Sequence, residues 1–147
     1  MNYTLKELKI FVKKISIRVK IGTVIYLRGD LGTGKTTLTK CFIENLFQKN
    51  KKKKPIVTSP TFNIVQYYLV TKKLIIAHYD LYRLKKSSDI NNIGLYDLED
   101  KMISIIEWPE LIKKKHKNRI EIKLSYTNND NERNVSIKSV SYTHLTL

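Results

Sequence analysis

The residues whose types and spacing could carry chemistry begin with a glycine-rich loop that ends in lysine and threonine. It fits the pattern G-x-x-x-x-G-K-[S/T], the phosphate-binding P-loop. Its eight positions are Gly29, Asp30, Leu31, Gly32, Thr33, Gly34, Lys35 and Thr36. In such a loop the glycines let backbone N–H groups approach phosphate, and the lysine adds a mobile positive charge. The sequence therefore predicts nucleotide binding; the alternative is a glycine-rich turn that fits by chance.

A P-loop nucleotidase needs a carboxylate at a strand end, to hold its magnesium ion or to position the attacking water. Two apolar stretches of this chain end in such an acid. Asp80 ends residues 74–80, and Glu107 ends residues 102–107. Because ligands of an open α/β sheet lie beyond the carboxyl ends of its parallel strands, either acid could reach the phosphates. We favour this role over the alternative that each acid only caps the turn that follows.

Three further polar residues are weaker candidates on their own. Thr61, in the Ser-Pro-Thr-Phe sequence at 59–62, could be a switch hydroxyl that senses the γ-phosphate, or it could stabilise a turn. Arg83 could contact phosphate or a partner, and a surface ion pair is an equal alternative. His78 alternates with Asp80 along a strand, so the two share a face, and we expect a packed or hydrogen-bonded histidine. No Cys/His cluster indicates zinc, and no Ser-His-Asp arrangement can be read.

The elements that must position these residues follow from hydrophobic periodicity. A buried strand is predicted at 23–27, directly before the loop, and a helix at 37–47 directly after it. A capping box at Thr4 and Glu7 predicts the start of an earlier helix. Its apolar stripe consists of Leu5, Leu8, Phe11, Val12 and Ile15. Further strands are predicted at 63–70, 74–79, 102–106, 119–125 and 134–140, with turns at 71–73 and 128–131, a lysine-rich loop at 48–54 and a short helix around 95–100.

These elements predict an α/β protein with a P-loop NTPase-like three-layer fold. The sheet should be mixed, mainly parallel with antiparallel additions, because the short hairpin links require antiparallel neighbours. A chain of 147 residues suits one domain, which we expect at 1–140 as a single P-loop ATPase domain. Residues 141–147 lack the lysine bias of the rest, and we treat them as a tail of doubtful origin without a function.

Composition indicates a globular protein of the cytoplasm. Hydrophobic residues make up 41% and charged residues 28%, no apolar run reaches the length of a membrane span, and no secretory signal opens the chain. We therefore expect no membrane partner. The single cysteine, Cys41, lies in a predicted helix, where packing is its expected role, and it suits a reducing compartment.

The net charge of +15 raises the alternative of a nucleic-acid-binding module. Two observations weigh against it. Lysine far outnumbers arginine, and asparagine and isoleucine are also abundant, which A/T-rich codons would produce by themselves. The lysine runs at 49–54 and 113–117 contain no interleaved aromatic residues, which is typical of solvated linkers and helix ends.

Four motifs in order closely resemble the TsaE (YjeE) family. They are GDLGTGKTTL at 29–38, SPTF at 59–62, HYDLYRL at 78–84 and IEWPE at 106–110. Members of this family are small bacterial ATPases needed for the threonylcarbamoyl modification of adenosine in tRNA. The resemblance extends from the first helix to about Arg133, with Thr33 where the family usually has alanine.

The resemblance implies roles for individual residues. ATP would be bound by residues 29–37, with Lys35 at its phosphates and Thr36 at Mg²⁺. Asp80 would belong to the magnesium shell, directly or through water. Glu107 would support magnesium binding or orient the hydrolytic water. The catalytic set is thus Glu107, Asp80 and Lys35, and the metal set Thr36, Asp80 and Glu107. Within that range Thr37 completes the loop set, and the remaining cofactor-binding residues would be Thr61, as the switch threonine, and Trp108, beside the nucleotide.

The resemblance also implies how the protein works. Its ATPase would be weak alone and would act docked on the TsaB–TsaD pair, where hydrolysis resets the complex between turnovers. Contact with tRNA would be indirect, through the complex. The loops around Thr61 and Arg83 would change with nucleotide state and report it to the partner. The alternative enzyme is a small P-loop kinase, which would need an arginine-rich lid, whereas only five arginines are scattered here.

Overall fold

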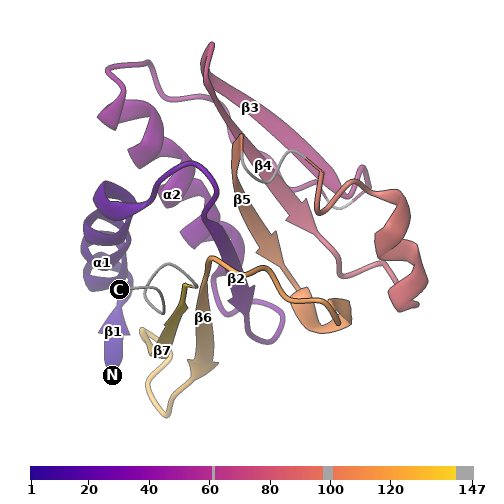
Figure 1. The fold of residues 1–147 in the computed structure, drawn as a ribbon. Helices are drawn as coiled ribbons and strands as arrows, with labels where there is room; N and C mark the ends of the chain where they lie inside the picture. The colour runs from indigo at the N-terminus through magenta and orange to yellow at the C-terminus, as the bar shows by residue number, and fades with distance from the viewer. Residues whose placement is uncertain (61, 98–100, 142–147) are drawn as a thin grey trace.

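The fold is built on one twisted, mixed sheet (Figure 1). The structure, a computed structural model, describes residues 1–60, 62–97 and 101–141. Within these ranges seven strands form a sheet in the order β1-β7-β6-β2-β5-β4-β3. The strands are β1 (Asn2–Thr4), β2 (Val24–Arg28), β3 (Val65–Thr71), β4 (Leu74–Asp80), β5 (Met102–Glu107), β6 (Arg119–Tyr126) and β7 (Glu132–Val140).

The centre of the sheet is parallel and its margins are antiparallel. The pairs β6–β2, β2–β5 and β5–β4 are parallel. The pairs β1–β7, β7–β6 and β4–β3 are antiparallel. The predicted α/β fold with a mixed sheet is therefore confirmed, with the parallel strands at the centre. Because β2, β5 and β4 run in the same direction, their carboxyl ends meet at one edge.

The two faces of the sheet are covered differently. Helices α1 (Leu5–Arg18) and α2 (Lys35–Lys49) lie side by side on one face (Figure 1). The other face is covered by turns and two short 3₁₀-helices, η1 (Ser87–Asn92) and η2 (Pro109–Leu111). Leu81, Ile90, Leu95 and Ile112 form one buried cluster there with strand residues. The third layer is thus irregular, without an α-helix among the described residues.

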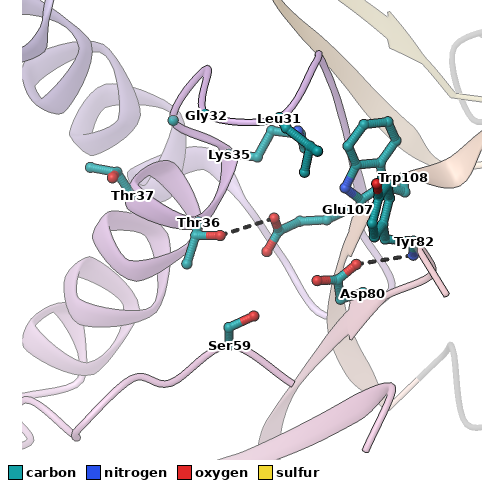
Figure 2. Close-up of a pocket in the computed structure, with 11 residues that line it drawn as sticks. Leu31, Gly32, Lys35, Thr36, Thr37, Ser59, Asp80, Tyr82, Glu107 and Trp108 are labelled. Carbon is teal, nitrogen blue, oxygen red and sulfur yellow. Dashed lines mark hydrogen bonds between the residues drawn. The ribbon is translucent and has the colours of Figure 1, made fainter. Parts of the chain in front are cut away.

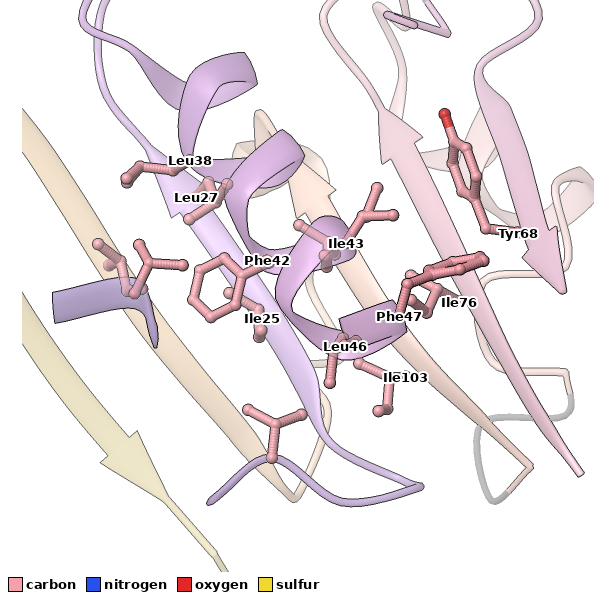
Figure 3. Close-up of a cluster of buried hydrophobic side chains, with 14 of the residues drawn as sticks. Ile25, Leu27, Leu38, Phe42, Ile43, Leu46, Phe47, Tyr68, Ile76 and Ile103 are labelled. Carbon is pink, nitrogen blue, oxygen red and sulfur yellow. The ribbon is translucent and has the colours of Figure 1, made fainter. Parts of the chain in front are cut away.

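Strand β2 joins the two halves of the core because its side chains alternate between the faces. Ile25 and Leu27 pack towards α2, whereas Val24 and Tyr26 pack into the opposite cluster. Figure 3 shows α2 laid across the sheet with its apolar side chains on the strands. The residues labelled on α2 are Leu38, Phe42, Ile43, Leu46 and Phe47, all of them buried. This packing fixes the start of α2, and with it the loop before it.

The predicted first helix and hairpins are confirmed in their main features. The backbone N–H of Thr4 donates to the Glu7 carboxylate at 3.0 Å, and that of Glu7 donates to the Thr4 hydroxyl at 3.3 Å. Leu8 and Val12 are buried as predicted, but Leu5 is 52% exposed, so the apolar stripe begins one turn later than expected. The β3–β4 and β6–β7 pairs form the predicted antiparallel hairpins.

Other boundaries differ from the prediction. Helix α2 begins at Lys35, inside the loop motif, and β1 was not predicted. The short helix expected around 95–100 is wrong for residues 95–97, which form a turn; the helical segment lies earlier, as η1. The Asp89 carboxylate accepts a bond from the Lys86 N–H at 3.2 Å, and Gly94 ends the segment with φ +70°. Thr61, residues 98–100 and residues 142–147 of the tail lie outside the described residues.

Candidate functional site

A pocket of about 440 Å³ lies at the carboxyl ends of the central strands, beside the start of α2. Figure 2 shows the P-loop, both candidate acids and an aromatic pair around it. The lining residues are Leu31, Gly32, Gly34, Lys35, Thr36, Thr37, Ser59, Asp80, Tyr82, Glu107 and Trp108. The tertiary structure thus brings together residues that are up to 77 positions apart, from Leu31 to Trp108 (108 − 31).

The glycines at 29 and 32 are required by close approach as well as by backbone geometry. Gly29 has φ +148°, and a Cβ there would lie 2.7 Å from the carbonyl oxygen of Leu124. Gly32 has φ +78°, and a Cβ there would lie 2.8 Å from the hydroxyl of Tyr126. Real Cβ atoms do not approach oxygen so closely, and side chains are strained at positive φ. Strand β6, which contains Leu124 and Tyr126, therefore packs directly against the P-loop.

Polar side chains hold the loop in this shape. The Tyr126 hydroxyl donates to the Leu31 carbonyl at 2.5 Å, and Arg133 Nε donates to the Thr33 carbonyl at 3.1 Å. The Thr33 hydroxyl turns into its own loop and donates to the Asp30 carbonyl at 2.8 Å. The threonine at the position where the family usually has alanine thus adds a bond inside the loop.

Lys35 is buried, and its ammonium group is already satisfied by the loop. Nζ donates to the carbonyl oxygens of Gly29 at 2.6 Å and Asp30 at 3.0 Å. It also lies 4.1 Å from the centre of the Trp108 ring, a cation–π contact. Burial lowers the pKa of Lys35, against the raising effect of nearby carboxylates such as Glu107. An incoming phosphate would exchange the two carbonyl contacts for a stronger, charged one.

Glu107 links the end of β5 to the first turn of α2. Its side chain is almost fully buried, and Oε1 accepts a bond from the Thr36 hydroxyl at 3.2 Å (Figure 2). Oε2 lies 2.6 Å from His78 Nε2 and accepts a longer bond from Thr39 at 3.4 Å. A carboxylate and a hydroxyl in contact at the mouth of a P-loop form the usual oxygen pair for magnesium.

Asp80 lies beside Glu107 on the neighbouring strand, as the parallel β4–β5 register pairs these two positions. One carboxylate oxygen accepts a bond from the Tyr82 N–H at 3.0 Å (Figure 2). Burial is the largest influence and raises the pKa of Asp80, the Tyr82 bond lowers it, and the charge of Glu107 raises it further. A nearby cation would lower the pKa of Asp80 and so oppose both raising effects.

Trp108 and Tyr82 form an aromatic wall of the pocket. Their ring centres are 4.8 Å apart and the planes are tilted by 43°. Trp108 has φ +58° and ψ +58°, an uncommon left-handed conformation for a bulky residue. Its backbone N–H donates to the Leu27 carbonyl at 3.3 Å, which joins this turn to the end of β2. The strained turn directs the indole towards Lys35.

The oxygen donors fit magnesium better than a transition metal. Within the described residues no group of three or more His, Cys, Asp and Glu side chains could hold a metal ion. Magnesium does not need such a cage, because it is commonly bound by one or two carboxylates together with substrate phosphates and water. Thr36, Asp80 and Glu107 line the pocket and could supply such a partial shell.

The site contains residues that the sequence reasoning missed. Ser59 and Tyr82 line the pocket, and Thr39 lies against Glu107. For Tyr82 its place two residues after Asp80 was a usable signal, whereas for Thr39 no local signal existed. His78 is packed and hydrogen-bonded, as expected. Arg83 lies outside the pocket lining and stacks over the Phe62 ring at 4.9 Å. The switch residue proposed at Thr61 lies outside the described residues.

The strand–loop–helix unit, the parallel sheet centre and the acids at the strand ends define a P-loop nucleotide-binding protein. Comparison with known proteins gives the family. The model of the family described as "Threonylcarbamoyl adenosine biosynthesis protein TsaE" matches residues 3–135. The chain belongs to the TsaE family, and its family role is in tRNA threonylcarbamoyladenosine biosynthesis. Family and fold together imply that it binds nucleotide.

Individual relatives agree with this assignment. A TsaE protein of Rickettsia prowazekii is 38% identical over 108 residues, covering 74% of this chain and 72% of the relative. A TsaE protein of Bacillus subtilis is 33% identical over 136 residues, covering 92% of this chain and 81% of the relative. A crystal structure of Bacillus subtilis YdiB superposes with a TM-score of 0.71 at 27% identity, covering 99% of this chain and 89% of that one. Over the part of our chain that is described, no helix is long and apolar enough to cross a membrane.

Proposed function

We propose that the chain binds and hydrolyses ATP with Mg²⁺, as an accessory subunit of the machinery that makes threonylcarbamoyladenosine in tRNA. The observation that carries this proposal is the contact between Thr36 and Glu107 at the mouth of the P-loop. It joins the hydroxyl expected to bind magnesium to a buried strand-end carboxylate. In P-loop NTPases a strand-end acid and the P-loop hydroxyl hold the magnesium ion on the nucleotide phosphates, and this contact matches that arrangement.

The roles of the side chains follow from their positions. Lys35 would bind the β- and γ-phosphates after leaving the loop carbonyls. Thr36, Asp80 and Glu107 would hold the magnesium ion, which neutralises charge on the phosphates when bound. Glu107 would also orient a water molecule towards the γ-phosphate, with its buried carboxylate held in place by its hydrogen bonds. Trp108 and Tyr82 would exclude bulk water from one side of the phosphates.

A second hollow could take the nucleoside. It has about 500 Å³, and it borders the P-loop at Gly32, Gly34 and Thr37, three residues that also line the first pocket. Its other walls come from β1, the start of α1 and the β6–β7 turn, and include Tyr3 and Asn131. We propose that the phosphates occupy the first pocket and the adenosine extends into the second, since both open on the same loop.

We further propose that the protein works with TsaB and TsaD, that its hydrolysis is slow alone, and that hydrolysis resets the complex between turnovers. The family role supports this, because threonylcarbamoyladenosine biosynthesis implies a complex. Leu31 and Tyr82 line the pocket, and Phe62 is three residues after the lining residue Ser59. All three side chains are exposed and offer a surface that a partner could bind. Contact with tRNA would be indirect.

The experiment measures phosphate released into water from MgATP by the protein alone and with purified TsaB–TsaD. We expect slow release that the pair accelerates and that Lys35→Ala abolishes. Lys40→Ala, an exposed lysine on the same helix, is the matched control and should behave like the unaltered protein. Transfer of phosphate to an acceptor molecule without free phosphate would instead identify a small P-loop kinase and contradict the proposal.

A further inference from the structure

His78 contributes a buried contact to the candidate site without lining the pocket. Its side chain is completely buried on β4, two residues before Asp80. It faces the α2 side, because it alternates with Ala77 and Tyr79, which pack on the opposite face. Its Nε2 lies 2.6 Å from Oε2 of Glu107, the shortest contact that the carboxylate makes among the described residues.

The hydrogen bonds around His78 indicate which ring nitrogen carries a proton. Nδ1 is buried and has no hydrogen-bond partner within the described part of the chain. A proton on Nδ1 would therefore be a buried donor without an acceptor, which is costly. The geometry therefore favours a proton on Nε2, donated to the Glu107 carboxylate at 2.6 Å.

The other residue next to Oε2 of Glu107, Thr39, is a weaker hydrogen-bond donor to this carboxylate. The Thr39 hydroxyl has one proton, and it lies 2.9 Å from the Lys35 carbonyl but 3.4 Å from Oε2 of Glu107. Because the shorter contact takes the proton, Thr39 contributes little to orienting the carboxylate. His78 is left as the main donor on that side.

We propose that His78 is the positioning residue for Glu107. By holding Oε2 it leaves Oε1 directed at the Thr36 hydroxyl, where the magnesium ion would be bound. Metal sites commonly depend on such outer partners, whose loss lowers metal affinity about 10- to 100-fold. This inference rests on the proposed magnesium-dependent function and names a residue that supports it from outside the pocket.

Two substitutions separate positioning from packing. In His78→Gln the side-chain amide can place a donor where Nε2 stood, and in His78→Asn the amide reaches only the Nδ1 position. The measurement is the affinity for ATP by calorimetry, once with Mg²⁺ and once with a chelator. The quantity compared is the gain in affinity that magnesium produces, since a packing defect would weaken binding in both conditions.

We expect His78→Gln to keep the magnesium gain within about threefold, and His78→Asn to lose it by about 10- to 100-fold. Affinity in chelator should stay within about twofold for both. His116→Gln, at a buried histidine that bonds Tyr26 on the opposite face of the sheet, is the matched control and should keep the gain. Equal losses in the Gln and Asn variants, or none in either, would overturn the positioning role.

A second measurement is made on the unaltered protein and uses a variant only to assign the signal. Nitrogen-15 NMR of the unaltered, nucleotide-free protein should show His78 with its proton on Nε2, and the signal is assigned by its absence in His78→Gln. A ring without a proton on Nε2 would overturn the proposal. If the unaltered protein gains nothing from magnesium, the proposed function fails as well; a normal gain that survives in His78→Asn removes the positioning role alone.

Discussion

Two buried histidines, on opposite faces of the same sheet, show how differently the two halves of this molecule are used. On the turn-covered face, His116 has both ring nitrogens partnered. Nδ1 lies 2.6 Å from the Tyr26 hydroxyl and Nε2 lies 3.1 Å from the Leu95 carbonyl, while Tyr96 stacks on the ring at 4.9 Å. On the helix-covered face, His78 bonds the site carboxylate and leaves Nδ1 unpartnered in the described region.

The comparison teaches that burial of a polar group does not by itself mark a site. The bonds of His116 join the turn at Leu95 and the loop before β6 to Tyr26 of β2, so its role is structural. The Tyr26 hydroxyl belongs to the same network, and burial raises its pKa to about 12. The bond of His78 ends at Glu107, a pocket residue. Its Nδ1, without a partner among the described residues, costs stability, and a role in function would explain why that cost is kept. We call the helix-covered face, with His78, the working face, and the turn-covered face, with His116, the supporting face. The following substitutions test this division.

Lys35→Ala should have the largest effect on the working face. Removing the ammonium deletes about two charge-assisted hydrogen bonds to phosphate, each worth about 1.5–3 kcal/mol. ATP affinity should fall about 1,000-fold or more, with the melting temperature showing that the chain still folds. Calorimetry with Lys40→Ala as control measures this. Unchanged affinity would refute the P-loop assignment.

Glu107→Ala should separate hydrolysis from binding. We expect phosphate release to fall about 100-fold, a typical loss for a residue that positions or activates a nucleophile, and ATP affinity to fall much less. The variant also leaves the His78 donor buried without its acceptor, which costs about 1–3 kcal/mol of unfolding free energy. Steady-state kinetics and denaturant unfolding measure the two effects. Equal losses in binding and hydrolysis would make Glu107 chiefly a magnesium ligand.

His116→Phe should affect the supporting face alone. It leaves the Tyr26 hydroxyl and the Leu95 carbonyl with one partner fewer, so the unfolding free energy should fall by about 1–3 kcal/mol. Magnesium-dependent ATP affinity should stay within about twofold. The double variant with Tyr26→Phe should cost less than the sum of the single ones, because the two residues share a bond. A loss of the magnesium gain like that expected for His78→Asn would contradict the division of the faces.

Asp80→Asn should have the smallest effect on stability. Unlike the preceding substitutions, it should stabilise the nucleotide-free protein. Burial raises the pKa of Asp80, so the folded protein holds this proton more tightly than the unfolded chain does. The corresponding stability is present at low pH and is lost as pH rises past the ordinary carboxyl range. Asparagine removes that loss and keeps an oxygen for the Tyr82 N–H.

We therefore expect Asp80→Asn to raise the melting temperature of the nucleotide-free protein at neutral pH by at most about 4 °C. The difference from the unaltered protein should vanish near pH 3, where the carboxyl is protonated. Magnesium-dependent ATP binding should weaken at the same time. Thermal unfolding as a function of pH measures the effect. A melting temperature that falls at neutral pH would show that the carboxylate charge stabilises the empty site.

Much of the fold was predictable because its signals are local. The P-loop pattern, the capping box at Thr4 and the alternating strands each depend on neighbouring residues, and all were confirmed in the structure. The short helix around 95–100 was the clearest wrong expectation within the described residues. There Ile90 and Leu95 pack into the buried cluster of the turn-covered face, a contact that local periodicity does not encode.

The sequence by itself determined the nucleotide-binding class, because glycine, lysine and threonine at those spacings suit phosphate. It also placed Asp80 and Glu107 at strand ends. Only the tertiary structure decided that these acids are neighbours, since that depends on the parallel β4–β5 register. It alone showed His78 and Thr39 behind Glu107, and Tyr126 and Arg133 behind the loop. Such contacts join distant segments, and no spacing along the chain encodes them.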